Sequence, residues 1–206
     1  MPRVIAGSVG GRRFVAPPGS ATRPTTDRVR EALFSALAPA LPGAVVLDLY
    51  AGSGALAIES LSRGAARAVL VEADRAAAEV ASRNLRQLGL EGGRVVVSDA
   101  RAFCRAPSGG PFDVVLADPP YALALEECAA AIGDLVSQGA VRRDAPIVLQ
   151  RSRHDPALAS PAGGRARDGA RPDLVLAGVA AERVRTYGDT ALIWWRAAPG
   201  SREAAT

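Results

Sequence analysis

The run Asp118-Pro119-Pro120-Tyr121 follows an apolar stretch and carries the most specific chemical signal in the chain. A carboxylate and a backbone carbonyl at the end of a strand can accept the two N–H groups of an exocyclic amine on a planar base, which directs the amine's lone pair at an electrophile. Two prolines stiffen such a turn, although they also commonly just stop a strand. An aromatic ring can stack on a base extruded from its helix. We therefore predict four catalytic residues: Asp118, Pro119, Pro120 and Tyr121.

A second run, Asp48-Leu49-Tyr50-Ala51-Gly52-Ser53-Gly54, joins an apolar stretch to a helical pattern. Glycines there let backbone N–H groups approach a ligand closely, but many strand-to-helix turns need glycine only to bend. The run lacks the third glycine of a dinucleotide fingerprint. It also carries an acidic residue before its glycines, which would repel a pyrophosphate and attract an ammonium group. The amino group of S-adenosylmethionine fits, and the predicted binding residues are Asp48, Tyr50, Gly52, Ser53 and Gly54.

Acidic residues also close the next two predicted strands. Glu72 follows the glycine turn by about twenty residues, where a carboxylate can accept both hydroxyls of a ribose. Asp74 is the neighbouring candidate, although it fits better as the cap of the next helix. At Asp99 and Ala100, a carboxylate or the adjacent backbone can meet an adenine amino group, and Asp99 can equally cap a helix over residues 100–105. Glu72, Asp99 and Ala100 complete the predicted cofactor site.

Five apolar runs alternate with helical patterns through the middle of the chain. Near-continuous Val, Leu and Ile are typical of strands buried on both faces of a parallel sheet. The predicted strands cover residues 45–49, 68–72, 94–98, 112–118 and 146–150, and the predicted helices cover 54–63, 74–88 and 123–136. This alternation predicts a doubly wound, Rossmann-like α/β fold, which binds ligands at the carboxyl edge of its sheet.

The N-terminal residues predict a small hairpin followed by a helix. Residues 4–6 and 12–16 flank two glycines, as the strands of a hairpin do. Thr25 or Thr26 can cap the helix. Apolar residues then repeat at helical spacing, at Val29, Leu33 and Leu37.

The C-terminal part predicts a loop and a second hairpin. Residues 151–172 are rich in Arg, Gly, Pro and Ala, so we expect an irregular loop. Residues 183–187 and 190–196, joined by Gly-Asp, predict a closing antiparallel hairpin. Trp194 and Trp195 are adjacent in a strand and must face opposite ways, so one belongs to the core and the other has a weak case for stacking on a base.

We expect three parts, which are a basic extension (1–43), an S-adenosylmethionine-dependent methyltransferase domain (44–196) and a frayed tail (197–206). The charge also varies along the chain. The net charge is +4 over 1–43, −3 over 44–150 and +3 over 151–206, and all 25 basic residues are arginines. An acidic middle between basic ends suits a polyanion gripped from the periphery, with solvated surface charge as the alternative. The predicted RNA contacts are Arg12, Arg13, Arg23, Arg28 and Arg30.

The order of the motifs DLYAGSG, VEAD, SDA and DPPY is similar to that in class I methyltransferases of exocyclic amines. Four further segments resemble the RsmD family, the bacterial 16S rRNA (guanine(966)-N(2))-methyltransferases: RVIAG (3–7), GGRR (10–13), TRPTTDRVRE (22–31) and YGDT (187–190). The resemblance covers most of residues 3–150 and then 185–195, while 151–181 is longer and looser than the family pattern. It implies a guanine N2 target in 16S ribosomal RNA, within the 30S subunit or an assembly intermediate.

Several other classes of protein or site are disfavoured. Cys104 and Cys128 match no metal-ligand spacing and suit buried packing in a reduced cytoplasmic protein. His154, the only histidine, lies in a polar stretch without metal-ligand neighbours. No apolar run is long enough to span a bilayer. We expect no metal, no membrane partner and a monomer in the cytoplasm.

Three rival functions fit parts of this pattern. A DNA adenine-N6 methyltransferase could use the same Asp-Pro-Pro-Tyr loop, but such enzymes usually need a recognition domain for which 206 residues leave little room. Methylation of a glutamine amide in a protein is disfavoured by the basic ends. A nonenzymatic RNA-binding subunit would leave the residues 118–121 unexplained.

Overall fold

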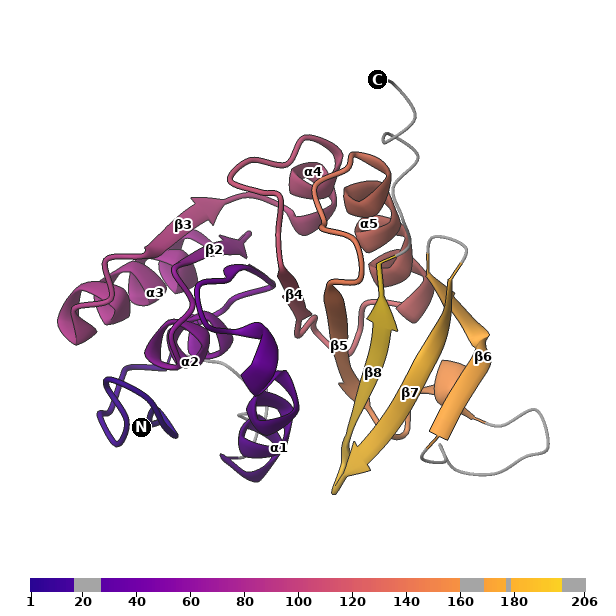
Figure 1. Cartoon of the computed structure of the whole chain (residues 1–206), viewed down its shortest axis with the longest axis horizontal. Helices are drawn as coiled ribbons and strands as arrows, with labels where there is room; N and C mark the ends of the chain where they lie inside the picture. The colour runs from indigo at the N-terminus through magenta and orange to yellow at the C-terminus, as the bar shows by residue number, and fades with distance from the viewer. Residues whose placement is uncertain (17–26, 160–168, 177–178, 198–206) are drawn as a thin grey trace.

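The computed structural model describes residues 1–16, 27–159, 169–176 and 179–197. In this part of the chain one eight-stranded sheet has the order β3-β2-β1-β4-β5-β8-β7-β6 (Figure 1). The strands are β1 (Val45–Leu49), β2 (Arg67–Glu72), β3 (Gly93–Val97), β4 (Val114–Ala117), β5 (Pro146–Ser152), β6 (Gly169–Leu176), β7 (Val179–Tyr187) and β8 (Thr190–Arg196). The α-helices are α1 (Asp27–Leu37), α2 (Ala55–Ser62), α3 (Arg75–Leu88), α4 (Ala100–Arg105) and α5 (Leu125–Ser137), and two 3-10 turns span Ala38–Ala40 and Pro156–Leu158.

Strand order reverses between β1 and β4. The chain proceeds outward from β1 through β2 to β3, then returns to place β4 and β5 on the other side of β1, and all these pairs are parallel. The carboxyl ends of β1 and β4 therefore lie side by side, with Leu49 opposite Ala117. A doubly wound sheet binds its ligand at this point. The predicted fold class is confirmed.

Helices cover both faces of the parallel half of the sheet. On the face that we call the α1 face, α1, α2 and α3 bury residues that include Phe34, Leu56 and Leu85. On the opposite face, the α5 face, α4 and α5 bury residues that include Phe103 and Leu135. This two-sided burial explains why the parallel strands are near-continuous runs of apolar residues.

Local sequence signals position the helices as expected. Val29, Leu33 and Leu37 of α1 are all buried, whereas Thr25 and Thr26, the expected cap residues, lie outside the described residues. Helix α3 begins where the Asp74 side chain accepts a hydrogen bond from the N–H of Ala77 at 2.7 Å. The sequence analysis expected Asp74 to cap this helix, and the structure confirms it. The cap fixes the start of α3 just beyond Glu72.

The expected N-terminal hairpin is present as a short one, with an antiparallel bridge between Arg3 and Arg13 and backbone hydrogen bonds between residues 2–4 and 11–14. Side chains from the helices also bind this segment. Glu59 of α2, fully buried, accepts the N–H groups of Ile5 at 2.7 Å and Ala6 at 3.1 Å. Asn84 of α3 likewise accepts the N–H of Val15 at 3.0 Å, further along the same segment.

The predicted C-terminal hairpin is present, with β7 extending back to Val179. The expectation of one irregular loop over residues 151–172 is wrong at both ends: the first two residues continue β5, and 169–172 belong to β6, while 160–168 lie outside the described residues. Strand β6 has weak strand propensity and pairs with β7 through register shifts. Its stability comes from burial of Leu174 and Leu176 in the core, which a local pattern does not reveal.

Trp194 and Trp195 do face opposite ways, but both belong to the core. Trp195 is 2% exposed and its indole N–H donates to the carbonyl of Leu174 at 3.1 Å. Trp194 is 7% exposed on the α1 face, so the idea that it stacks on a base is wrong. Ala197, expected to start a frayed tail, is buried and exchanges hydrogen bonds with the loop before β5. The other residues of that expected tail, 198–206, lie outside the described residues.

We predict that Glu59→Ala lowers the free energy of unfolding by about 3 kcal/mol, because it leaves two backbone N–H groups and Arg63 without their acceptor. Urea unfolding measures the loss, and limited proteolysis reports release of the N-terminal segment. Glu79→Ala, an exposed site on α3, is the control and should stay within about 0.5 kcal/mol of the parent. Equal midpoints for the two variants would contradict this role of Glu59.

Candidate functional site

The turn after β1 adopts an uncommon backbone conformation. Tyr50, Gly52 and Gly54 have φ angles of 64°, 54° and 84°. At Gly54 the positive φ favours glycine, and a Cβ there would lie 2.9 Å from a methyl carbon of Leu70, which would have to move. A Cβ built on Gly52 meets nothing within 4 Å, which shows that this residue borders open space. The turn thus leaves room for a ligand at the point where α2 begins.

Glu72, the last residue of β2, holds this turn in place. One carboxylate oxygen accepts the N–H of Gly52 at 2.7 Å, and the other accepts the N–H of Asp74 at 2.9 Å. Each carboxylate oxygen has a second lone pair. The half-buried Glu72 can therefore fix the glycine turn and still accept hydroxyl groups from a ligand.

Asp48 is the most deeply buried acid of the site, at 1% exposure. Its Oδ2 accepts the N–H of Ala57 in α2 at 3.0 Å, while Oδ1 is buried with no hydrogen-bond partner among the described residues. Burial is the main cause that raises the pKa of Asp48 to about 8; the Ala57 N–H lowers this pKa, and the nearby carboxylates of Asp118 and Glu72 raise it. The side chain is short of one donor, which a cationic N–H group would supply.

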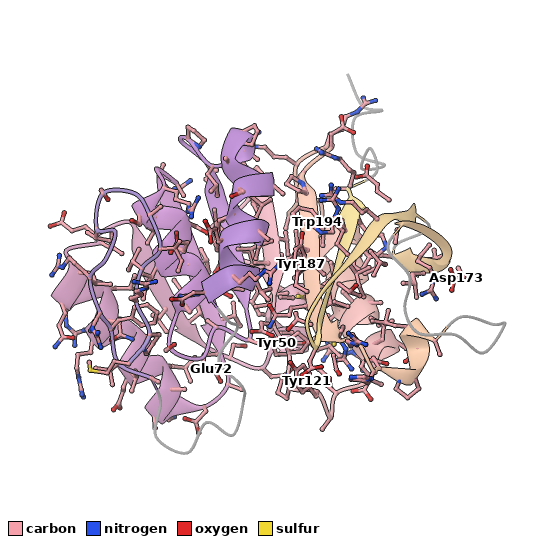
Figure 2. The ribbon with its side chains drawn as sticks, turned by 90° about the horizontal axis from the view of Figure 1, so that it is seen from below. Tyr50, Glu72, Tyr121, Asp173, Tyr187 and Trp194 are labelled. Carbon is pink, nitrogen blue, oxygen red and sulfur yellow. The ribbon has the colours of Figure 1, made fainter. Side chains whose placement is uncertain are left out.

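The Asp118 loop continues β4 directly beside this turn. The N–H of Asp118 donates to the carbonyl of Leu49 at 3.3 Å. Pro119 is buried, Pro120 is exposed with its carbonyl accepting the N–H of Leu123 at 3.0 Å, and Tyr121 is 49% exposed. Figure 2 looks onto this edge of the sheet, where Tyr50 lies between Glu72 and Tyr121. The structure thus brings together the two runs of residues singled out in the sequence.

Asp99 and Ala100 lie at the start of α4. Asp99 caps the helix by accepting the N–H of Ala102 at 3.0 Å, and Ala100 is buried. The capping alternative for Asp99 is therefore confirmed. The carboxylate is exposed at the carboxyl edge of the sheet, and contact with an adenine stays a prediction.

Tyr50 and the two cysteines pack behind the site. Tyr50 is half-buried and shares a hydrogen bond with the thiol of Cys128, and burial raises the pKa of its hydroxyl. Burial also raises the pKa of Cys128 to about 11 and that of Cys104 to about 12. Both thiols are free and buried, as expected for packing residues, and their raised pKa values disfavour the nucleophilic thiolate.

Two further residues position the site, although the sequence did not single them out. Fully buried Asn84 donates to the carbonyls of Val15 at 2.9 Å and Ser53 at 3.0 Å and accepts the N–H of Val15, so it links the N-terminal segment to the glycine turn. Arg151, 3% exposed, pairs with Asp155 and donates to the carbonyl of Tyr121 at 3.4 Å. A lone Asn in a helix and one Arg among 25 give no sequence signal for these contacts.

The structure corrects part of the predicted RNA-contacting set. Arg30 is 2% exposed and donates to Asp27 and to the carbonyl of Arg3, so it is a buried structural residue and its assignment as an RNA contact is wrong. Arg12 is exposed, but its guanidinium donates to the last two carbonyls of α3. Arg13 and Arg28 are exposed and remain predictions, and Arg23 lies outside the described residues.

Three observations concern other classes of site. Within the described ranges, no three His, Cys, Asp or Glu side chains gather closely enough to hold a metal ion. His154 lies at the surface with its Nε2 3.6 Å from a carboxylate oxygen of Asp189. Of the helices that the structure describes, none is long and apolar enough to cross a membrane.

Comparison with known proteins establishes the family. A family model described as "Conserved hypothetical protein 95" matches residues 2–168. Ribosomal RNA small subunit methyltransferase D of Haemophilus influenzae is 35% identical over 159 residues, which cover 76% of this chain and 81% of the relative. The chain belongs to the RsmD family.

Other relatives agree with this membership. Ribosomal RNA small subunit methyltransferase D of Escherichia coli is 47% identical over 125 residues, so the matched part is 61% of this RsmD-family chain and 63% of that relative. The solved structure of "Putative methyltransferase yhhF from Escherichia coli" superimposes with a TM-score of 0.77 at 34% identity, covering 96% of this chain and 98% of that one. The family resemblance expected from the motifs is confirmed.

We predict that Asp48→Asn flattens the pH dependence of stability. The folded wild type keeps a proton on Asp48 up to a pKa of about 8, whereas the unfolded chain loses it near the ordinary value of 3.8, so wild-type stability falls as pH rises between these values. Asparagine does not titrate, so the free energy of unfolding of Asp48→Asn should not fall in this way. Urea unfolding at pH 5 and pH 8 measures the change in the free energy of unfolding, with the exposed Asp144→Asn as control. Equal slopes for wild type and Asp48→Asn would contradict a buried, neutral Asp48.

Proposed function

We propose that this chain transfers the methyl group of S-adenosylmethionine to the exocyclic N2 amine of a guanine in the 16S ribosomal RNA of the small subunit. The observation that carries the proposal is the meeting of the glycine turn, Glu72 and the Asp118 loop at the reversal of strand order, in a chain of the RsmD family. The relatives named above supply the small-subunit RNA as substrate class. The guanine N2 position rests on the motif resemblance.

The residues at the glycine turn fit S-adenosylmethionine. Asp48 Oδ1 is buried and has no hydrogen-bond donor among the described residues. The ammonium group of the cofactor would supply that donor. Glu72 can accept the ribose hydroxyls while it holds Gly52, and Asp99 with Ala100 lies where the adenine would reach α4. When bound, S-adenosylmethionine supplies a methyl group on a positively charged sulfur, which is already a good electrophile. The protein therefore needs to supply alignment and exclusion of water.

Asp118 orients the amine. An exocyclic amine is a poor nucleophile because its lone pair is delocalised into the base. Accepting one of its N–H groups at Asp118 turns the lone pair toward the methyl group, and the carboxylate can take the proton that becomes acidic as the new N–C bond forms. Tyr121, half-exposed at the loop, stacks on the flipped base, and Arg151 holds the loop through the Tyr121 carbonyl. Pro119 and Pro120 stiffen the loop between them.

We expect the substrate to be a folded RNA surface, because a domain of 206 residues has little area for reading RNA sequence. Purified protein with tritiated S-adenosylmethionine should methylate 30S particles, or protein-bound 16S RNA, from a strain that lacks this enzyme. Naked RNA and short hairpins should be much poorer substrates, and we expect a monomer acting in the cytoplasm. Equal activity on an isolated hairpin, or preference for duplex DNA, would contradict the ribosomal assignment.

Asp118→Ala should lower the turnover rate by at least about a hundredfold, because it removes an interaction made mainly in the transition state. Asp118→Asn retains a hydrogen-bond acceptor and should lose less. Isothermal titration should give a nearly unchanged dissociation constant for S-adenosylmethionine in both variants. Near-normal turnover by Asp118→Ala would show that another group orients the amine.

A further inference from the structure

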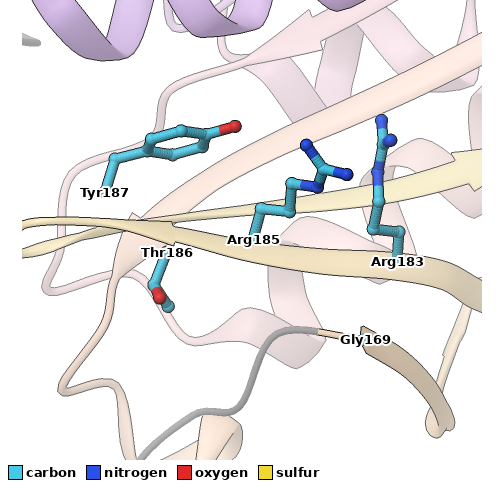
Figure 3. A pocket seen from close by; sticks show the side chains of 5 residues that line it. All are labelled: Gly169, Arg183, Arg185, Thr186 and Tyr187. Carbon is cyan, nitrogen blue, oxygen red and sulfur yellow. The ribbon is translucent and has the colours of Figure 1, made fainter.

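Strand β7 presents two arginines and a tyrosine on one side. Arg183, Arg185 and Tyr187 alternate along the strand and rise from the same side of it, whereas Thr186 points away (Figure 3). Together with Gly169 and Thr186 they line an open pocket of about 420 Å³. We call Arg183, Arg185 and Tyr187 the β7 row.

The β7 row carries positive charge that the described residues do not neutralise. Within the described ranges no carboxylate forms an ion pair with Arg183 or Arg185. Glu182, the residue before Arg183, lies 3.5 Å from Arg196 instead. Arg183 is held over the ring of Trp194 at 4.6 Å from its centre. A guanidinium group whose plane rests on an aromatic ring keeps its N–H donors available at its rim. The row therefore offers donors for an anionic partner.

The register of the sheet connects the β7 row to the catalytic loop. Leu192 of β8 pairs with Gln150 of β5 on one side and with Arg185 on the other. Asp118 directly follows the last residue of β4 that pairs with β5, so it lies beside Gln150. Arg185 is thus three strands from Asp118 in the same row, about 14 Å at the usual strand spacing. Tyr187 lies two pairs further toward the carboxyl edge of β5, opposite Thr190.

Both ends of this path lie on the same face of the sheet. Leu116 of β4 pairs with Val148, Val148 with Trp194, and Trp194 with Arg183. Directly paired residues point to one face, and Leu116, Val148 and Trp194 all belong to the buried cluster of the α1 face. The arginines of the β7 row therefore share a face with the residues that lead into the Asp118 loop.

We propose that the β7 row binds the sugar-phosphate backbone of the RNA next to the target nucleotide, with Arg183 and Arg185 on phosphates and Tyr187 stacked on a neighbouring base. This proposal rests on the proposed function. The site itself holds the carboxylates of Glu72 and Asp118, which repel phosphates, so an RNA that delivers a base there needs positive charge nearby. Arginine forks fit phosphate oxygens, and an aromatic ring accepts any base.

The test compares two double variants of equal charge change. Arg183→Gln with Arg185→Gln removes both arginines of the row. The control replaces Arg67 and Arg105 by Gln; both are exposed, and they lie at the start of β2 and the end of α4, away from the carboxyl edge. Binding of 16S RNA and of 30S particles is measured over a range of salt concentrations, together with S-adenosylmethionine affinity and thermal stability.

The row variant should bind RNA at least about tenfold more weakly, and the slope of log K against log salt should become less steep by about two, one per lost phosphate contact. Cofactor affinity and the control should stay at wild-type values. Arg185→Gln alone, which removes an exposed side chain without the Trp194 contact, should lower RNA affinity by a few-fold and keeps the test valid if the double variant is unstable.

Two outcomes would overturn the proposal for the β7 row. Unchanged RNA affinity and salt slope in the row variant would show that the row does not contact RNA. Unchanged affinity for naked RNA with weakened binding to 30S particles would assign the row to a protein component of the particle. In both cases wild-type methylation would stand, whereas absence of methyl transfer by the wild type would refute the proposed function and leave RNA binding by the row measurable.

Discussion

The placement of β4 against β1 is the constraint on which the rest of the structure depends. Because the chain returns to β1 after building β2 and β3, the carboxyl ends of β1 and β4 meet with helices on both faces. The glycine turn and the Asp118 loop are 64 residues apart in sequence from Gly54 to Asp118, and only this pairing makes them neighbours. Glu72, at the end of the next strand, then fixes the turn by accepting the N–H of Gly52.

Electrostatics divide the edge of the sheet into two parts. The acids Asp48, Glu72 and Asp118 gather at the centre, where burial and the two neighbouring carboxylates raise the pKa of Asp48 to about 8. Such a centre suits a cofactor with a cationic amino group and a cationic sulfur. The arginines of the β7 row lie to one side, where they can hold an RNA backbone that the acidic centre would otherwise repel. The register of β4, β5, β8 and β7 thus places the arginines of the β7 row in line with the acidic centre.

The sequence was most informative where local pattern and function coincide. The parallel strands, the glycine turn and the Asp-Pro-Pro-Tyr loop follow from apolar runs and special residues at their ends, and the fold class follows from their order. Strand β6 and the buried Trp194 could not be predicted, because tertiary packing decides both. The arginine cluster near the N-terminus misled for the same reason: Arg30 is buried among its own neighbours. Arg183 and Arg185 of β7, which the sequence analysis did not single out, line an open pocket instead.

The identity of the methylated atom tests the central claim most directly. Small-subunit RNA methylated by the purified protein with labelled S-adenosylmethionine is digested to nucleosides, and the labelled product is identified by chromatography and mass spectrometry. We predict that the label appears in N2-methylguanosine. Label in N6-methyladenosine would keep the amine-orienting site and contradict the guanine target, and label on a ring carbon or a ribose oxygen would contradict the role assigned to Asp118.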